Sequence, residues 1–459
     1  MQKPLTKYKK FAAKPLVEGG VVMNTHANEL KNCLLEIIKE MGSKPQQFST
    51  SKSGSFTRKR KFGFETLMRF ILSLGSNSLG HEIGEFFEYS EGFPTASAFV
   101  QQRKKLSYKA FKHLFHEFNR QNDNSPTLFQ GYRLLAIDGS DLSLPYNPDE
   151  DTVVGKNHLS TLHLNAAFDV ETKQFVDAVV QKGIKENECS AACELVDALS
   201  EQYPVIIMAD RGYESYNLFA HIEERLFDYV IRIKDVKSNG MLSGMDLPDT
   251  ETFDVTKRII ITRHSTGPAA VNPKKYKYLT KQSRFDFINN SKAPDYEMTI
   301  RFVRFKITSD TYETIATSLS EDRFSVEELK EVYRRRWAIE TGFREVKYIL
   351  GLQAVHSKQE NTILQEIYAR LVMYNFSMAI TLNTPIKIEG KEKDLKHHLQ
   401  VNFTQATKVC LKFFKFRGLE PAYDIEATIR RFLLPIRPNR QRQRIAVSTT
   451  VVSFNYRLA

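Results

Sequence analysis

Two short apolar runs that each end in an aspartate constrain the fold of this chain most strongly. Residues 133–138 are Arg-Leu-Leu-Ala-Ile-Asp, and residues 204–210 are Pro-Val-Ile-Ile-Met-Ala-Asp. Apolar runs of this length are typical of strands that are buried on both faces of a sheet. The segments between and after them are expected to form a hairpin, two helices and a further strand, over residues 161–181, 188–202, 214–226 and 228–234. The chain is therefore predicted to contain an α/β layer.

The segment from Ser325 to Gly351 is predicted to form one charged helix. Ser325 is a suitable N-cap, Glu328 is its capping-box partner, and Gly351 follows the last apolar residue. On a helical wheel, one apolar stripe consists of Val332, Ile339, Phe343, Val346 and Leu350. A second stripe directly beside it consists of Tyr333, Arg336, Glu340 and Lys347, with Trp337 at its edge. A solvated face with i,i+4 salt bridges is one interpretation, but an amphipathic helix ordinarily places its charges on the opposite side.

Three acidic residues from separate elements are candidate metal ligands. Asp138 and Asp210 end the two predicted strands, and Glu340 lies on the charged helix. Two divalent metals held by carboxylates can activate a nucleophile and neutralise a leaving oxygen in phosphoryl transfer. Asp141 competes with Asp138, but residues three apart in a strand point to opposite faces. Glu345 competes with Glu340, but it lies about 140° further around an ideal helix. An acid at a strand end also commonly begins a turn, so only the combination supports a site.

The composition favours a basic protein with reduced cysteines and a polyanionic partner. The 459 residues are 41% hydrophobic and 26% charged, with a formal net charge of +12, which favours nucleic acid as a partner. The four cysteines have no zinc-site spacing and predict free thiols. We recognise no signal peptide, and Glu366 and Arg370 interrupt the long apolar segment 362–381. We therefore expect a cytoplasmic protein without a membrane partner.

Changes in periodicity and composition predict five regions. Residues 1–125 are expected to be all-α. The predicted regions after them are a first part of an α/β core, a β-rich insertion, a second part of the core and a basic C-terminal region, over residues 126–234, 235–324, 325–384 and 385–459. The insertion is too long to be a simple loop.

Three basic features are candidate DNA-binding surfaces. Helices expected at 79–89 and 95–106 flank a Gly-Phe-Pro turn and resemble a helix-turn-helix, whose second helix would contact DNA through Arg103 and Lys104. An ordinary helical bundle with a basic surface explains this pattern equally well. Alternating cations of the insertion could form one basic sheet face, namely Arg258, Arg263, Arg301, Arg304 and Lys306. Six arginines within residues 430–444 could follow DNA phosphates or form a solvated end.

Taken together, these motifs resemble those of bacterial insertion-sequence transposases of the DDE class. The spacing of Tyr333, Arg336, Glu340 and Lys347 resembles the YREK signature of these enzymes. Together with Asp138-Gly-Ser, Asp210-Arg-Gly-Tyr and the long insertion, it resembles the family founded on insertion sequence four. The resemblance covers roughly residues 130–375. It implies a ribonuclease H-like core interrupted by the β-rich insertion, with an N-terminal all-α DNA-binding domain and a helical basic C-terminal region. It also implies that Asp138, Asp210 and Glu340 bind two Mg²⁺ ions per active site, for which Mn²⁺ can substitute.

The same resemblance assigns DNA contacts. The residues expected to hold phosphates and the displaced base near the cut are Tyr333, Arg336, Lys347 and Arg211. Trp337 is expected to stack on the flipped base. Relatives carry a second aromatic in the insertion, which has no tryptophan here, so a Tyr or Phe such as Tyr312 would have to serve.

The implied reaction is cut-and-paste transposition through a DNA hairpin. Water would nick one strand at the element's end, the new 3′ hydroxyl would close a hairpin, a second water would open it, and the 3′ ends would join target DNA. The expected partners are the terminal inverted repeats, target DNA and a second copy of the chain, in the nucleoid of a bacterial cell. Two alternatives stay open. A structure-selective nuclease of the same fold would share the acids, and a non-catalytic DNA-binding regulator would share the charge.

Overall fold

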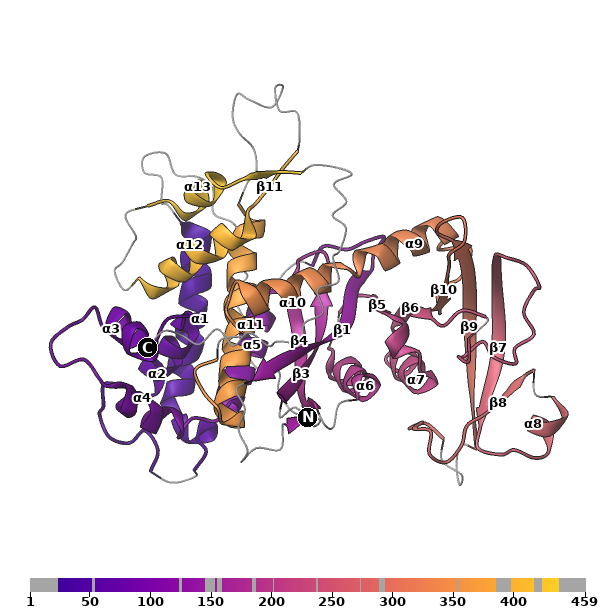
Figure 1. Cartoon of the computed structure of the whole chain (residues 1–459), viewed down its shortest axis with the longest axis horizontal. Coiled ribbons are helices and arrows are strands. Elements are labelled where there is room, and N and C mark those ends of the chain that lie inside the picture. The colour runs from indigo at the N-terminus through magenta and orange to yellow at the C-terminus, as the bar shows by residue number, and fades with distance from the viewer. Residues whose placement is uncertain are drawn as a thin grey trace, which may run out of the picture.

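The computed structural model describes residues 24–436 apart from residues 52–53, 124–125, 145–152, 155–158, 184–186, 201, 237, 273, 289–293, 353–354, 385–397 and 417–422. A ten-stranded mixed sheet runs through the middle of the molecule. Helices from both ends of the chain gather at one end of this sheet, and the strands of the predicted insertion lie at the other (Figure 1). Most of the arginine run expected near the C-terminus lies outside the described residues.

The strands of the large sheet are β1 Arg133–Leu144, β2 Val153–Val154, β3 Leu159–Asp169, β4 Gln174–Lys182, β5 Val205–Ala209, β6 Asp228–Ile233, β7 Phe253–Thr262, β8 Tyr276–Tyr278, β9 Asp295–Lys306 and β10 Tyr312–Thr317. Their order is β2-β3-β1-β5-β6-β10-β9-β7-β8, with β4 paired to β3. β1, β5 and β6 are parallel neighbours, whereas β3 is antiparallel to both β1 and β4. The two apolar runs that end in aspartate therefore belong to neighbouring strands, as predicted. A separate two-stranded ladder joins β11 Leu399–Gln400 and β12 Leu434–Pro435.

The α-helices of the described chain are α1 Thr25–Ser43, α2 Phe64–Ser73, α3 Leu79–Phe86, α4 Ala96–Arg103, α5 Lys109–Asn122, α6 Glu188–Ala198, α7 Tyr216–Glu224, α8 Pro268–Val271, α9 Val326–Arg335, α10 Ala338–Tyr348, α11 Glu360–Leu382, α12 Phe403–Lys415 and α13 Ile425–Arg430. Every helix expected from the sequence is present, with small differences at the ends. The exception is the charged helix, which is divided into α9 and α10.

Alternate residues of the central strands face two different cores. In β1, Leu134 and Ala136 belong to a core that also contains α9, α10, α11 and the N-terminal helices. Leu135 and Ile137 belong to a second core, which contains α6 and α7. This alternation is the period of two that a strand imposes on its side chains. The sheet is therefore covered by helices on both faces, which explains why its strands are uninterrupted apolar runs.

The predicted insertion extends the main sheet. β10 pairs with β6 in antiparallel orientation, and β9 and β7 continue the sheet outward. The expectation that the cations of the insertion form one basic sheet face is wrong for Arg301 and Arg304, because both are buried. The guanidinium of Arg301 pairs with Asp254 at 2.6 Å and that of Arg304 with Asp235 at 2.6 Å. These two arginines stabilise the sheet from within and are not available to DNA.

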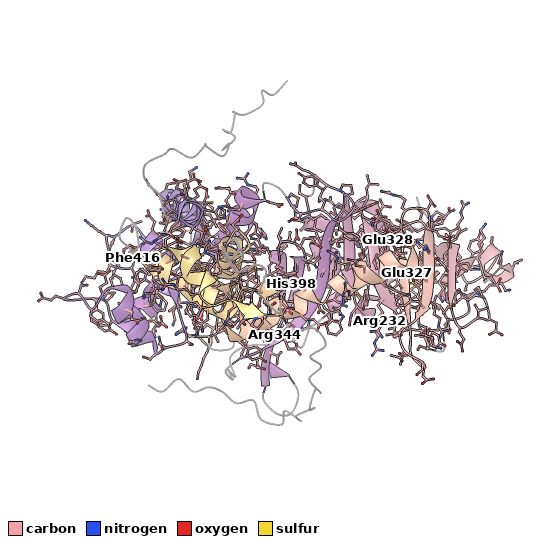
Figure 2. All side chains as sticks on the ribbon, turned by 90° about the horizontal axis from the view of Figure 1, so that it is seen from above. Arg232, Glu327, Glu328, Arg344, His398 and Phe416 are labelled. Atoms are coloured by element: carbon pink, nitrogen blue, oxygen red, sulfur yellow. The ribbon has the colours of Figure 1, made fainter. Side chains whose placement is uncertain are left out.

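α11 is the element that joins the helical end to the sheet. Nearly all of its residues between Thr362 and Thr381 are buried, because α5, α2 and α12 pack around it and β4 lies beside it. Figure 2 shows the molecule from above, with Phe416 among the helices at one end and Glu327 and Glu328 at the start of α9 beside the insertion strands. No helix within the described residues has the length and apolar character needed to cross a membrane.

Candidate active site

The strand register places Asp138 beside Asp210. Ala136 of β1 is paired with Met208 of β5, so two residues further along the parallel ladder lead to the two aspartates. Side chains alternate between the two faces of a strand, so both acids are expected on the face covered by α9 and α10, as are Ala136 and Met208. The expectation that the first strand ends at Asp138 is wrong, because β1 continues to Leu144 through its pairing with β3. Asp138 is thus held within a strand and Asp210 directly after one.

The charged helix is broken next to the acids. The predicted capping box is present, with the Glu328 N–H donating to the Ser325 hydroxyl at 3.3 Å. Gly351 has a φ of +71°, the left-handed conformation that favours glycine after a helix. Between these ends, the N–H of Trp337 donates to the carbonyl of Arg334 at 3.3 Å, a tight turn that separates α9 from α10. Glu340 therefore stands in the first turn of a new helix, on the side that faces β1.

Arg336 lies between two of the three predicted catalytic acids. One guanidinium nitrogen, Nη2, donates to Glu340 Oε1 at 3.0 Å, and Nη1 lies 3.5 Å from Asp138 Oδ2. The guanidinium is also 5.7 Å from the ring centre of Tyr333 and 5.4 Å from that of Trp337. Only 4% of Arg336 is exposed. This arginine is therefore the central cation of the site.

The pKa of Asp138 reflects the charged groups around it. Burial raises the pKa of Asp138 to about 6, and the negative charges of Asp210 and Glu340 also act in this direction. The charge of Arg336 and the N–H of Gly139, which donates to Asp138 Oδ1 at 2.9 Å, oppose the rise. The negative charges of Asp210 and Glu340 therefore lie close enough to Asp138 to disfavour its ionised form.

Sequence reasoning missed two residues behind this site, Glu188 and His163. His163 Nδ1 lies 2.8 Å from Asp141 Oδ1, and His163 Nε2 lies 3.1 Å from Glu188 Oε1. A Cβ atom added to Gly139 would lie 2.2 Å from His163 Nε2, so only glycine fits after Asp138. No local motif marks this pair, because β3 and α6 bring it together. As predicted for a continuing strand, Asp141 points away from Asp138.

The other acidic competitor is also directed away from the site. The Tyr374 hydroxyl donates to Glu345 Oε2 at 3.1 Å, within the core between α10 and α11. Glu340 keeps 38% of its side chain exposed. This difference agrees with the choice of Glu340 over Glu345 from the helical wheel.

The residues expected to contact DNA differ in their exposure and in their contacts. Lys347 reaches back to β1, where its Nζ donates to the Asp141 carbonyl at 2.6 Å. Trp337 is 48% exposed, whereas Tyr333 is only 5% exposed and lies in the core beside Arg232. Arg211 is exposed in the turn after Asp210. The third aromatic candidate, Tyr312, starts β10, with the Arg304 guanidinium 4.2 Å from its ring centre.

The expectation that Arg103 contacts DNA is wrong for this structure. Its guanidinium is 3% exposed and pairs with Glu366 of α11 at 2.9 Å, and it also donates to Gln365 Oε1 at 3.0 Å. Burial of a paired arginine is a structural role, since no face of the guanidinium remains for a phosphate. Lys104, the next residue, is exposed.

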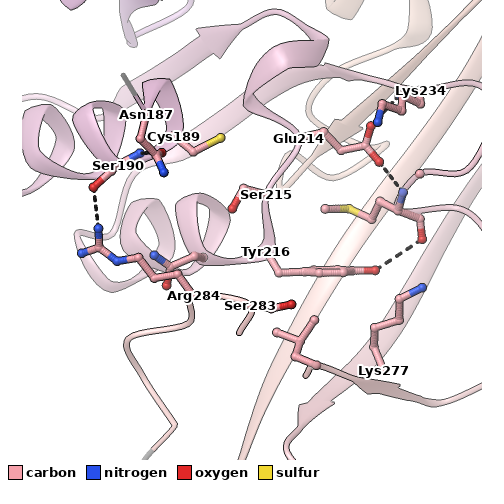
Figure 3. A pocket seen from close by; sticks show the side chains of 14 residues that line it. Asn187, Cys189, Ser190, Glu214, Ser215, Tyr216, Lys234, Lys277, Ser283 and Arg284 are labelled. Atoms are coloured by element: carbon pink, nitrogen blue, oxygen red, sulfur yellow. Dashed lines mark hydrogen bonds between the residues drawn. The ribbon is translucent and has the colours of Figure 1, made fainter. Parts of the chain in front are cut away.

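A pocket opens behind the turn that carries Asp210. Its volume is about 420 Å³, and it lies between the starts of α6 and α7 and the inner edge of the insertion (Figure 3). Lys234, Lys277 and Arg284 line it, against the single acid Glu214. The Glu214 carboxylate accepts hydrogen bonds from the backbone N–H groups of Lys234 and Met241. The lining therefore carries three positive charges and one negative charge.

The three acids have the ligand atoms that a hard divalent cation prefers, but their side chains are not positioned around a common metal site in this structure. Carboxylate oxygens are the ligands that Mg²⁺ and Mn²⁺ prefer. Among the residues described, however, no three His, Cys, Asp or Glu side chains are arranged to hold a metal ion. The guanidinium of Arg336 lies where Asp138 and Glu340 would share one. The donor set therefore fits a metal on condition that Arg336 moves.

Comparisons with known proteins identify the family. Residues 129–376 match the family model described as the transposase DDE domain. The chain is 23% identical over 383 residues to the putative transposase InsL of insertion sequence element IS186A from Escherichia coli, with 78% of this chain and 97% of that one covered. It is also 23% identical over 384 residues to the transposase of insertion sequence element IS421 from Escherichia coli, with the same coverage.

A solved structure of the piggyBac transposase in a synaptic complex with hairpin DNA aligns with 91% of this chain and 87% of its own, at 12% identity and a TM-score of 0.43. The family model by itself spans more than half of the present sequence, from the start of the sheet to the middle of α11. The chain therefore belongs to the DDE-domain transposases, enzymes that carry out phosphoryl transfer on DNA.

Proposed function

We propose that this enzyme excises an insertion sequence through a DNA hairpin and joins its 3′ ends to target DNA. The observation that carries the proposal is the position of Trp337, which is half exposed at the break between α9 and α10, next to the Arg336 that contacts Asp138 and Glu340. A nuclease that only nicks DNA has no need of an exposed aromatic next to its acids. Hairpin formation needs one, because the duplex end must distort.

Asp138, Asp210 and Glu340 would hold two Mg²⁺ ions, with Mn²⁺ as a substitute. When bound, such ions activate the attacking hydroxyl and neutralise the leaving oxygen at phosphorus. The strand order β4-β3-β1-β5-β6 supports a ribonuclease H-like core for these acids. In that core, the N–H of Gly139 orients Asp138, and the N–H of Gly212 orients Asp210 at 2.8 Å.

The other residues of this chain would bind and distort the DNA end. Lys347 lies beside β1 and would hold a phosphate next to the cut, while Arg336 would hold a second one once it leaves the acids. Trp337, half exposed at the helix break, would stack on an extruded base. Arg211 and the cations of the pocket in Figure 3 would follow the backbone away from the acids, because they continue the same edge of the sheet.

The partners implied are the terminal inverted repeats of the element, target DNA and a second copy of the chain on the paired ends. Lys104, exposed at the C-cap of α4, remains a candidate for recognition of the repeats.

The first prediction tests the metal ligands. Asp138→Asn, Asp210→Asn and Glu340→Gln should each abolish Mg²⁺-dependent cleavage of an end-labelled duplex that carries the element's end. DNA affinity should be unchanged or higher, because each change removes a negative charge. Denaturing gels measure cleavage, and gel-shift titration measures affinity.

The matched control is Glu345→Gln, which makes the same chemical change on α10 but on the side directed to Tyr374. It should keep cleavage near the parent level. Full cleavage by any of the three site variants would exclude that residue as a ligand. Nicks without hairpins in the parent enzyme would favour the nuclease alternative, and no cleavage at all would favour a regulator.

A further inference from the structure

We propose that Arg336 keeps the catalytic acids closed to metal in the free enzyme, and that a DNA phosphate draws it away so that metal can bind. The proposal rests on the proposed function, since it takes Asp138 and Glu340 as metal ligands. It adds an order of events, in which DNA binding precedes metal loading.

The first support is the position of the guanidinium. Its two terminal nitrogens approach Asp138 at 3.5 Å and Glu340 at 3.0 Å, so it bridges acids from a strand and a helix. A divalent ion that bound these oxygens would place its charge within contact distance of the guanidinium. Like charges at such separations repel strongly. The cation and the arginine therefore exclude each other.

The second support is that Arg336 cannot give way by losing its proton. A guanidinium stays charged at any pH at which the protein is folded. The side chain must therefore move as a whole, and its charge needs another partner when it does.

The third support is that Arg336 is incompletely satisfied where it lies. A guanidinium has five N–H donors, yet the Nε atom of Arg336 is buried and has no hydrogen-bond partner among the described residues. An unsatisfied buried donor is costly. A phosphate, which accepts two parallel bonds from an arginine fork, would satisfy more donors than the acids do.

The fourth support is the local backbone. Arg336 sits in the tight turn between α9 and α10, next to the half-exposed Trp337. A side chain at this junction has a short route from the acids to the surface where DNA would lie. The helix break thus places Arg336 between the carboxylates of the site and the surface where a DNA phosphate would bind.

The test measures metal binding without DNA. Mn²⁺ affinity, followed by the electron paramagnetic resonance signal of free Mn²⁺, should rise about tenfold or more in Arg336→Ala, because a unit positive charge beside the acids is removed. The matched control is Arg335→Ala, which removes the neighbouring arginine that pairs with Glu171 and with Glu331 at 2.6 Å. Its Mn²⁺ affinity should equal that of the parent. Unchanged or weaker Mn²⁺ binding by Arg336→Ala would overturn the proposal.

A second arm adds a short blunt-ended DNA duplex, with Asp138→Asn as the blank for Mn²⁺ bound by the DNA itself. The duplex should raise the Mn²⁺ affinity of the parent severalfold and that of Arg336→Ala much less. An equal rise in both proteins would show that DNA acts on the acids without the arginine, which contradicts the proposal.

Two further variants keep the outcomes separate. If Arg336→Ala fails to fold in EDTA, Arg336→Gln, which keeps a donor to Glu340 without the charge, should show the same rise in affinity. The double variant Arg336→Ala with Asp138→Asn should lose the gained Mn²⁺ binding. If the double variant keeps the gained Mn²⁺ binding, Asp138 is not a metal ligand and the assigned metal site is wrong. If Arg336→Ala shows no rise in Mn²⁺ affinity while Asp138→Asn lowers the affinity of the parent, the metal site is correct and the role given to Arg336 is wrong.

Discussion

At the scale of single residues, Glu345 makes the stability of the fold depend on pH. Burial raises the pKa of this carboxyl to about 7, even though the Tyr374 hydroxyl donates to it and acts in the opposite direction. In the unfolded chain an ordinary glutamate releases its proton near pH 4.3. Between these two values the folded protein holds a proton that the unfolded chain has lost. The free energy of unfolding therefore falls as the pH rises through this window and stays low above it.

The second prediction is that Glu345→Gln stabilises the protein more at pH 8 than at pH 5. The glutamine keeps an acceptor for Tyr374 and removes the buried negative charge, so the gain at pH 8 should be about 1–3 kcal/mol. Urea unfolding at both pH values measures it. Glu327→Gln, at an exposed glutamate of α9, should show no such difference. An equal gain at both pH values would mean that the charge of Glu345 is not the cause.

Residue roles could be predicted from the sequence only where the partner is implied by spacing. The positions of Asp138, Asp210 and Glu340 were predictable, because two apolar runs and one helical stripe direct them to a common edge. Arg103 and Arg301 were not, because their partners Glu366 and Asp254 come from distant elements. An arginine in a sequence has the same appearance whether its partner is a phosphate or a buried carboxylate.

At the scale of elements, the strands and most helices follow from periodicity, but the break between α9 and α10 does not. Residues 335–338 contain neither Gly nor Pro, and the apolar stripe of Val332 and Ile339 continues across the break into the same core. The turn instead accompanies the insertion of Arg336 between the acids. Tertiary contacts of this kind override local preference, which is why a helical wheel found the correct face but not the interruption.

The third prediction concerns Trp337, which stands at this break. If Trp337 stacks on an extruded base, Trp337→Ala should leave the first nick nearly normal and slow hairpin closure about tenfold or more, because stacking is typically worth 1–3 kcal/mol per base. Its 48% exposure argues against a core role, so the variant should fold. Denaturing gels of an end-labelled substrate separate the two steps, and Trp337→Phe should restore hairpin closure in part. Equal loss of both steps would refute the stacking role.

At the scale of the whole molecule, the predicted boundaries at residues 125 and 384 do not coincide with boundaries of the hydrophobic core. One continuous core includes Leu34 of α1, Phe115 of α5, Phe376 of α11 and Phe413 of α12, together with one face of the sheet. The sequence could assign each segment its secondary structure, but α11 is buried on all sides, and such a helix does not indicate which neighbours surround it.

Polar contacts also join the N-terminal helices to α11. The Asn375 side chain donates to Asn119 at 2.8 Å, Gln365 donates to the Leu106 carbonyl at 2.6 Å, and Glu366 pairs with Arg103. If the helices were removed, buried groups of α11 would lose their partners, and an unpaired buried charge or amide is strongly destabilising.

The last prediction is therefore that a fragment lacking residues 1–125 does not fold independently into a weak DNA binder. A fully buried large apolar side chain contributes about 1.5–3 kcal/mol, so exposing about six of them on α11 would offset a typical total stability of 5–15 kcal/mol. Residues 126–459 expressed alone should melt without a cooperative transition and bind a hydrophobic dye, whereas co-expression with residues 1–125 should restore both cooperativity and solubility. The control is the intact chain with Lys104→Ala, an exposed change directly after α4 that should melt like the parent. A cooperative transition of the fragment near the parent's melting temperature would instead show that the helices form a separable domain.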